Sequence, residues 1–380
     1  MSGIYIHIPF CKQACFYCDF HFSTLSAGRP GSLKRKNEMI KALAREIVMR
    51  KSELIDDIET IYFGGGTPSL MRTEEVQFLI DTIYGNYSII EKPEITLEAN
   101  PDDLTEANIK KLANSSINRL SIGVQSFFDD DLLFMNRAHN AKESENSIKI
   151  AKDYFDNISI DLIYGIPNMT NEKWLKNLNK TFELNIQHLS SYALTVEDRT
   201  ALANFIKKGK YPPLDENLAQ EHFYTLIEET KKNEFEQYEI SNFSREGWIS
   251  KHNSSYWQEK HYLGIGPSAN SFDGKTRSWN IANNAKYIKS ITAGILPNEN
   301  EILSKKDQLN EIVMTGLRTK WGVSLSDIEN KFGEKYKNNL LQNANKHLIR
   351  NMLKIEDEIL FITEKGMFYA DGITSDLFSV

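Results

Sequence analysis

The chain has 380 residues, of which 41% are apolar and 26% are charged, a composition typical of a globular protein with a substantial core. Its 52 acidic residues outnumber its 45 basic residues, and the net charge of −7 disfavours nucleic acid as a main partner. No stretch approaches the roughly 20 apolar residues that cross a bilayer, and the first residues contain no basic leader. We therefore expect a cytoplasmic protein that does not span a membrane.

The first predicted strand, residues 4–8, leads into a loop that contains all three cysteines of the chain, Cys11, Cys15 and Cys18. The spacing C-x3-C-x2-C suits a short loop whose thiolates converge on one point, and converging thiolates bind soft metals. Three cysteines would leave one iron of a [4Fe–4S] cluster without a protein ligand. That iron could then chelate a small molecule.

Two other uses of these cysteines remain open. A structural zinc site needs four ligands, and His7, Asp19 or His21 could supply the fourth. A disulfide with one spare thiol is the other alternative, although an odd cysteine count in a chain that we expect in a reducing compartment disfavours it.

After the cysteine loop, apolar runs alternate with amphipathic stretches. This alternation predicts parallel strands with helices outside them, in an open sheet or a barrel. The predicted strands are residues 60–63, 95–98, 119–124, 158–164, 188–194 and 238–240, and the predicted helices are residues 34–51, 73–84, 105–114, 142–154, 171–184 and 216–233.

Chemically unusual residues follow or interrupt successive strands. The run Gly64-Gly65-Gly66-Thr67-Pro68 ends one strand, and Glu98, Gln125 and Asp161 interrupt others. TIM-like barrels carry their functional residues at the carboxyl ends of successive strands. About six strand–helix units suggest an incomplete barrel of this kind. For the glycines the alternative is a tight turn, and for the polar residues it is a salt bridge with Arg137.

The strand–helix pattern ends near residue 240, and the chain divides there into three predicted parts. Residues 1–240 form the barrel, residues 241–300 a connecting segment rich in aromatic residues, and residues 301–380 a third part. In this third part, helices at 305–318, 325–332 and 336–352 precede a hairpin at 353–363, an arrangement like a winged helix. The hairpin turn at 356–358 is acidic, so we prefer a structural or lid role to DNA binding.

Together these motifs resemble the coproporphyrinogen III oxidase-like family of radical S-adenosylmethionine (SAM) proteins. The resemblance covers most of the chain, and it is carried by Tyr5-x-His7-Ile-Pro-Phe-Cys11, Gly64-Gly-Gly-Thr-Pro68, Glu98, Ser121-Ile-Gly-Val-Gln-Ser126, Asn136-Arg137-x-His139 and Asp161-Leu-Ile-Tyr-Gly-Ile-Pro167. It implies an α/β fold with a partial (β/α)6 TIM-like barrel.

The resemblance also implies roles for individual residues. The three cysteines would ligate a [4Fe–4S] cluster, and its open iron would bind SAM. The residues implied in the SAM pocket are Gly65, Gly66, Thr67 and Glu98, together with Tyr5, Gln125, Arg137 and Asp161.

The family contains two functions, which two sequence features distinguish. Oxidases that decarboxylate coproporphyrinogen III carry a further cysteine two positions after the third ligand, where this chain has Phe20. Heme chaperones of the HemW type lack that cysteine and carry H-N-x-x-Y-W, present here as His252-Asn253-Ser254-Ser255-Tyr256-Trp257. A neutral imidazole is a common axial ligand of heme iron, and aromatic rings can pack on a porphyrin.

We therefore expect a heme chaperone in which His252 ligates the iron, with Asn253, Tyr256 and Trp257 as the other heme-binding residues. Its partners would be heme, an electron donor and an acceptor protein, for which a membrane-associated respiratory protein is one candidate. Core packing is the alternative use of the hexapeptide at 252–257. The alternative functions are an oxidase that makes protoporphyrinogen IX and a nonenzymatic protein that binds zinc.

Overall fold

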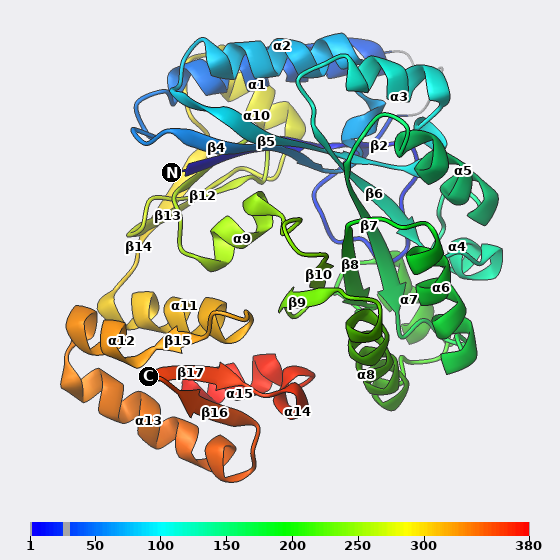
Figure 1. Ribbon diagram of the computed structural model, residues 1–380. Coiled ribbons are helices and arrows are strands. Elements are labelled where there is room, and N and C mark those ends of the chain that lie inside the picture. Colours follow the sequence, from blue (N-terminus) through cyan, green and yellow to red (C-terminus); the bar gives the residue numbers. More distant parts are fainter. Residues whose placement is uncertain (1, 26–30, 380) are drawn as a thin grey trace.

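The apolar runs form the centre of a twelve-stranded sheet in the computed structural model, which describes residues 2–25 and 31–379. Six neighbouring strands are parallel and follow the order of the chain. They are β1 (Ser2–Ile8), β4 (Ile58–Gly65), β5 (Ile89–Ala99), β6 (Arg119–Gln125), β7 (Asn157–Tyr164) and β8 (His188–Ala193). The two ends of the sheet do not pair with each other, so the predicted partial barrel is confirmed (Figure 1).

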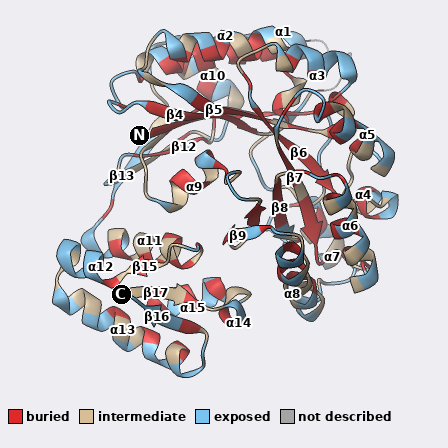
Figure 2. Ribbon diagram, viewed as in Figure 1, coloured by how far each residue is buried: buried red, intermediate tan, exposed pale blue. Residues whose placement is uncertain are grey.

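Helices cover the outer face of the parallel strands. In α1 (Ser32–Met49), Met39, Leu43 and Ile47 recur at helical spacing and are buried. Figure 2 shows the same division in the other outer helices, with buried residues toward the sheet and exposed residues away from it. These helices are α2 (Thr73–Tyr84), α3 (Glu106–Ala113), α5 (Ala141–Ala151), α6 (Asn171–Glu183) and α8 (Glu216–Lys232), and the short helices α4 (Asp129–Phe134) and α7 (Ala201–Lys207) lie near the strand ends.

Alternation along the strands separates an apolar outer face from a polar lumen. In β1, Ile4 and Ile6 belong to the hydrophobic core, whereas Tyr5 and His7 point to the other face and hydrogen bond to each other at 3.2 Å. Polar residues recur on the inner face of the neighbouring strands, so this barrel has a polar interior above which a site can form. The inner residues include Thr60, Tyr62, Thr96, Glu98, Ser159, Asp161, His188 and Ser190.

Short strands that were not predicted extend the sheet at both edges. On one side β11 (Tyr262–Ile265) runs parallel to β1, and β12 (Asn270–Phe272), β13 (Thr276–Asn280) and β14 (Asn298–Ile302) follow it as antiparallel strands. On the other side, β10 (Asn242–Ser244) lies antiparallel to β8 and carries β9 (Glu236–Glu239). The run predicted at 238–240 is thus an antiparallel edge strand and adds no parallel unit.

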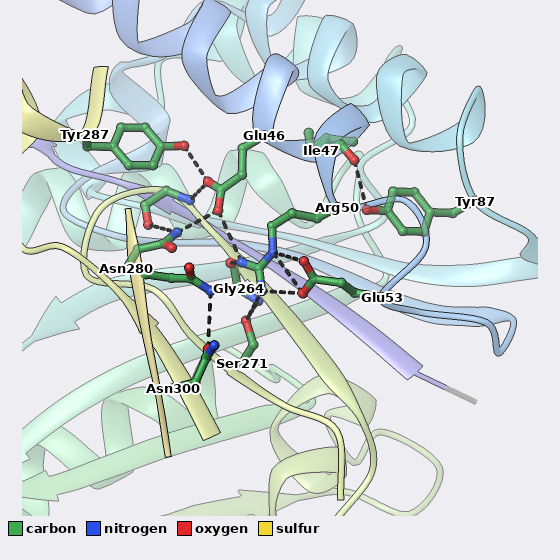
Figure 3. Close-up of polar contacts among 12 residues, drawn as sticks. Glu46, Ile47, Arg50, Glu53, Tyr87, Gly264, Ser271, Asn280, Tyr287 and Asn300 are labelled. Atoms are coloured by element: carbon green, nitrogen blue, oxygen red, sulfur yellow. Dashed lines mark hydrogen bonds and ion pairs between the residues drawn. The ribbon is translucent and has the colours of Figure 1, made fainter. Parts of the chain in front are cut away.

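A buried ion-pair network fixes α1 to this added part of the sheet (Figure 3). Glu46, which is 0% exposed, accepts hydrogen bonds from Tyr287 Oη at 2.5 Å and Asn280 Nδ2 at 2.7 Å. Arg50 lies 3.2 Å from Glu46 and donates to the carbonyl oxygen of Gly264 at 2.8 Å. The network therefore joins α1 to β11, to β13 and to α10 (Asn284–Thr292).

The last part of the chain has a hydrophobic core of its own, which includes Leu309, Ile328, Leu340 and Leu360. It contains α11 (Lys305–Leu317), β15 (Val323–Ser324), α12 (Leu325–Phe332), α13 (Glu334–Ile349), β16 (Leu353–Glu356), β17 (Ile359–Ile362), α14 (Glu364–Met367) and α15 (Ala370–Leu377). The predicted hairpin is confirmed, and its turn lies at two residues with positive φ, Asp357 and Glu358. No helix among the described residues is long and apolar enough to cross a bilayer.

Candidate functional site

The cysteine loop leaves β1 and passes through β2 (Phe10–Cys11), which pairs with β3 (Ser23–Thr24). Cys11, Cys15 and Cys18 all line one cavity of about 400 Å³ at the carboxyl ends of the parallel strands. Burial raises the pKa of the Cys11 thiol to about 11 and that of the Cys18 thiol to about 12. These two thiols therefore keep their protons at neutral pH, and a metal that binds them must displace those protons.

The donors around the cavity can be compared with what a single ion and a cluster require. Among residues 2–25 and 31–379, no three His, Cys, Asp or Glu side chains are gathered closely enough to hold one metal ion. A tetrahedral zinc site needs four ligands at about 2.0–2.3 Å from one point, whereas a cubane spreads its thiolate ligands over separate irons. The three thiols line one cavity, where they could serve separate irons of one cluster.

The triple glycine closes the wall beside the cysteine loop. A Cβ on Gly65, whose φ is +106°, would lie 2.5 Å from the ring of His7, and a Cβ on Gly66 would lie 2.6 Å from the carbonyl oxygen of Phe10. The backbone N–H of Thr67 donates to that same carbonyl at 2.7 Å. The glycines are thus needed for close packing against β1 and β2, and the resulting turn exposes backbone to the cavity.

Glu98 lies on the inner face of β5, opposite this turn. It accepts hydrogen bonds from Tyr62 Oη at 2.8 Å and from the backbone N–H of Gly65 at 3.2 Å. Burial is the largest influence on this carboxyl and raises its pKa to about 7. Burial likewise raises the pKa of Asp161 on β7 to about 6, although Ser190 and Ser121 hydrogen bond to it. Near neutral pH these carboxyl groups can change protonation as a ligand enters.

Arg137 links the cavity wall to the cysteine loop. Its guanidinium donates to Asn100 Oδ1 at 2.7 Å, to the carbonyl oxygen of Gly123 at 2.9 Å and to the sulfur of Cys15 at 3.3 Å. Among the ion pairs of the described part of the chain, none joins Arg137 to a carboxylate, so the salt bridge considered from the sequence is wrong. The arginine serves instead as a donor to neutral groups and a thiol.

Gln125 ends β6 in an unusual backbone conformation. Its φ is +68°, which is uncommon for a residue other than glycine, and the pairing of β6 with β7 is irregular at this point. The turn directs the side chain into the cavity beside Arg137, Glu98 and Asp161. Strained backbone of this kind is often found at binding sites.

The residues implied by the resemblance divide between this cavity and the lumen beneath it. The cavity is lined by the three cysteines, Gly65, Gly66, Thr67, Glu98, Gln125, Arg137, Asp161 and also Asn253. Tyr5, His252, Tyr256 and Trp257 do not line it. Tyr5 lies in the lumen, where its ring stacks on Tyr62 with centroids 6.1 Å apart.

The hexapeptide at 252–257 forms most of α9 (Lys251–Trp257), which lies at the open side of the barrel (Figure 1). His252 is 1% exposed, and its ring stacks on Tyr62 with a centroid separation of 4.7 Å. Its Nδ1 pairs with Thr60 Oγ1 at 2.7 Å and its Nε2 with Tyr256 Oη at 2.8 Å. Burial lowers the pKa of His252 to about 3, so the ring is neutral.

Both nitrogens of His252 therefore have partners, and an iron atom could reach Nε2 only after Tyr256 has moved away. The end of α9 is also engaged, because the guanidinium of Arg318 lies 5.4 Å from the ring centroid of Trp257. This contact joins α9 to the C-terminal domain. In this conformation the hexapeptide lies against the lumen through His252 and contacts the C-terminal domain through Trp257.

Sequence reasoning missed several residues that line the cavity. Asn100 orients Arg137, while Ser190 and Tyr192 extend the inner face of β8. A signal for the last two was present, since Ser190 and Tyr192 follow His188 at every second position of the run at 188–194. Asn100 follows Glu98 by two positions and so continues the same inner face.

Comparisons with known proteins agree with this geometry. Residues 5–181 match the family model described as the radical SAM superfamily, and residues 303–369 match the HemN C-terminal domain. The heme chaperone HemW of Lactococcus lactis is 34% identical over 375 residues, covering 98% of this chain and 96% of that protein. The heme chaperone HemW of Bacillus subtilis is 33% identical over 387 residues, covering 98% of each.

A solved structure resembles the whole fold. Coproporphyrinogen III oxidase (HemN) from Escherichia coli superimposes with a TM-score of 0.85 and 21% sequence identity, covering 100% of this chain and 90% of that one. At this identity the likeness concerns the fold. The barrel, the connecting segment and the C-terminal domain all have counterparts in that structure.

Proposed function

The chain belongs to the HemW family of radical SAM proteins, and on this premise we propose that it is a heme chaperone that carries a [4Fe–4S] cluster with exchangeable SAM. One observation carries the proposal. Three cysteine thiols, a glycine turn and two carboxyl groups with raised pKa values face one cavity at the carboxyl ends of the barrel strands. An acceptor protein, proposed as a membrane-associated respiratory protein, and an electron donor complete the proposal.

Different residues around the cavity would contact the cluster and SAM. Cys11, Cys15 and Cys18 would ligate the cluster, which together with SAM supplies one-electron chemistry when bound. Arg137 places a positive charge against the sulfur of Cys15. Glu98, with its pKa near 7, can either donate or accept a hydrogen bond from a ligand hydroxyl at neutral pH.

Aromatic side chains would limit access of water to the same cavity. Tyr17 and Phe22 form part of its lining. Phe20 also lines it and is 66% exposed, at the position where the oxidases of the family carry a cysteine. A phenyl ring cannot donate a proton or ligate iron, so Phe20 favours a heme chaperone over an oxidase that decarboxylates coproporphyrinogen III.

His252 remains the heme ligand proposed from the sequence. Its ring is neutral, as iron ligation requires, but its Nε2 is hydrogen bonded to Tyr256. Ligation there requires the Tyr256 hydroxyl to leave Nε2. The proposal thus predicts that heme binding at His252 changes the position of Tyr256, the neighbour of Trp257 in α9.

Anaerobic reconstitution tests the proposal in two parts. The protein is loaded with iron and sulfide, titrated with hemin, and separately incubated with SAM, reductant and coproporphyrinogen III. We expect a brown cluster in the wild type that is lost in Cys11→Ala, a Soret band from bound heme, and no porphyrinogen product. Formation of protoporphyrinogen IX without stable heme binding would instead identify an oxidase.

A further inference from the structure

The loop that carries the three cysteines lies against the end of α4. Gln13 and Ala14 in this loop are exposed, so burial in a core does not hold them in place. The turn at residues 135–137, which follows α4, supplies hydrogen-bond partners to both of them. The position of this part of the loop therefore depends on the turn.

The turn ends α4 in a Schellman motif. The backbone N–H of Arg137 donates to the carbonyl oxygen of Leu132 at 2.9 Å. The backbone N–H of Asn136 donates to the carbonyl oxygen of Leu133 at 3.1 Å. Asn136 has a φ of +57°, and glycine is the usual residue at this left-handed position of the motif. Ending the helix therefore does not require the side chain of an asparagine.

The cysteine loop uses that side chain. Asn136 Nδ2 donates to the carbonyl oxygen of Ala14 at 2.7 Å. In return, Gln13 Nε2 donates to the carbonyl oxygen of Asn136 at 2.9 Å. The loop and the turn are thus joined in both directions at one residue.

The neighbouring residues of the turn extend this pairing. Arg137 donates to the sulfur of Cys15 at 3.3 Å, and the backbone N–H of Phe16 donates to the carbonyl oxygen of Met135 at 3.1 Å. Each of the four consecutive loop residues from Gln13 onward therefore has a partner in the turn.

The turn is in turn supported by the barrel. Asp131 in α4 is buried and accepts hydrogen bonds from Ser126 Oγ at 2.7 Å and from Lys173 Nζ at 2.6 Å. Ser126 directly follows β6, and Lys173 belongs to α6. Groups held by side chains that are themselves fixed keep their positions precisely.

A free segment between Cys11 and Cys15 would have to be ordered when a cluster binds, at a cost in conformational entropy. We propose that Asn136 is a positioning residue for the cluster, and that its hydrogen bond to Ala14 holds this segment ready. The inference rests on the proposed cluster and deepens it, because it names a residue that decides how firmly the cluster is held. Asn136 does not line the cavity, so it acts through the loop.

The experiment uses the full-length protein, before and after anaerobic reconstitution with iron and sulfide. Asn136→Gly removes the donor to Ala14 and suits the positive φ, whereas Asn136→Asp keeps the shape of the side chain but cannot donate. The matched control is Asn185→Gly, because Asn185 is an exposed asparagine with a φ of +48° after α6.

Three measurements are made on each protein. A ferrous-iron chelator is added to the reconstituted protein, and the loss of cluster absorbance gives the rate at which the cluster is released. Hydrogen exchange of residues 13–16 before reconstitution reports whether the loop is ordered without iron. Thermal melts report the stability of the whole fold.

We expect both Asn136 variants to release the cluster about fivefold faster than the wild type or more, the effect of one lost hydrogen bond. Their residues 13–16 should exchange faster, and the melting temperature of Asn136→Gly should be no lower than that of the wild type. The control should match the wild type in release and exchange.

Equal release rates in the wild type and both Asn136 variants would overturn the inference and leave the proposed cluster standing. Faster release together with a lower melting temperature of Asn136→Gly would assign Asn136 to the stability of the fold, and would also overturn it. A wild type that binds no cluster would overturn both the inference and the proposed cluster.

Discussion

At the scale of single residues, the clearest feature is a set of histidines that the fold keeps neutral. Burial lowers the pKa of His7 and His139 to about 4 and that of His252 to about 3. An unfolded histidine, with a pKa of about 6.5, binds a proton that the folded one excludes. Each such group therefore stabilises the fold above pH 6.5, and its contribution is lost as the pH falls toward the lowered value.

For His252→Gln we predict a weaker dependence of stability on pH. Between pH 7 and pH 5 the wild-type histidine should lose about 2 kcal/mol of its contribution, and glutamine has no proton to gain. Comparing the two proteins cancels the opposing effect of Glu98 and Asp161, whose raised pKa values favour the fold in acid. Urea unfolding at both pH values measures the difference. Equal losses in both proteins would mean that His252 is protonated in the folded state.

The sequence predicted much of the site at this scale, for a physical reason. The carboxyl ends of parallel strands meet at one edge, so Glu98, Gln125 and Asp161 converge wherever the strands are parallel. The environment of His252 could not be predicted, because its partner Thr60 lies far away in the chain. Only the hydrogen bond to Tyr256, four residues along a helix, followed from local spacing.

At the scale of elements, the network around Glu46 and Arg50 decides how α1 is attached to the sheet. We predict that Arg50→Met costs about 3–5 kcal/mol of stability, because it leaves a buried carboxylate without its cation. Burial already raises the pKa of Glu46, and loss of Arg50 would raise it further. Protonation removes the charge of an unpaired carboxylate, so Arg50→Met should lose less stability at pH 5 than at pH 7.

Two further variants test the origin of that cost, each by chemical unfolding. The double variant Glu46→Gln with Arg50→Met should recover part of the loss, since no charge then remains buried. The control is Lys110→Met, which breaks an exposed pair with Glu106 and should leave stability almost unchanged, because solvent screens such pairs. A cost for Arg50→Met as small as that of the control would contradict the prediction.

Long elements were predicted better than short ones. The helices at 73–84 and 325–332 match α2 and α12, because their apolar residues recur over two turns or more. The strands β11 to β14 were missed, since they are three to five residues long and β14 reads Asn-Glu-Asn-Glu-Ile. Pairing with neighbours stabilises such strands, and no pattern within five residues encodes the neighbour.

At the scale of the whole molecule, two hydrophobic cores meet at few points. The larger surrounds the barrel strands and the smaller lies within residues 305–377. Ile240 and Met367 are partly buried and pack against both. The backbone N–H of Lys320 also donates to the carbonyl oxygen of Tyr238 at 3.0 Å. We propose that the boundaries between the barrel, the connecting segment and the C-terminal domain lie near residues 240 and 300.

We predict that Leu360→Ala loosens the C-terminal domain and leaves the barrel intact. Leu360 is 0% exposed in the smaller core, and such truncations cost about 2–5 kcal/mol. Hydrogen exchange followed by mass spectrometry should show faster exchange in residues 305–377 and no change in β4 to β7. Leu120→Ala, in the larger core, should give the reverse pattern. Equal acceleration in both regions would mean that the two cores unfold as one unit.

The position of β1 has a consequence for how the protein is made. This strand is synthesised before the other strands of its sheet, yet it lies between β4 and β11, and β11 begins only at Tyr262. While the chain is leaving the ribosome, one side of β1 is therefore an unpaired edge next to an apolar face, and such edges invite association between chains. Until the connecting segment has emerged, nascent chains need protection from one another, and fragments that stop before Tyr262 should be far more prone to aggregate than those that stop after Ile302.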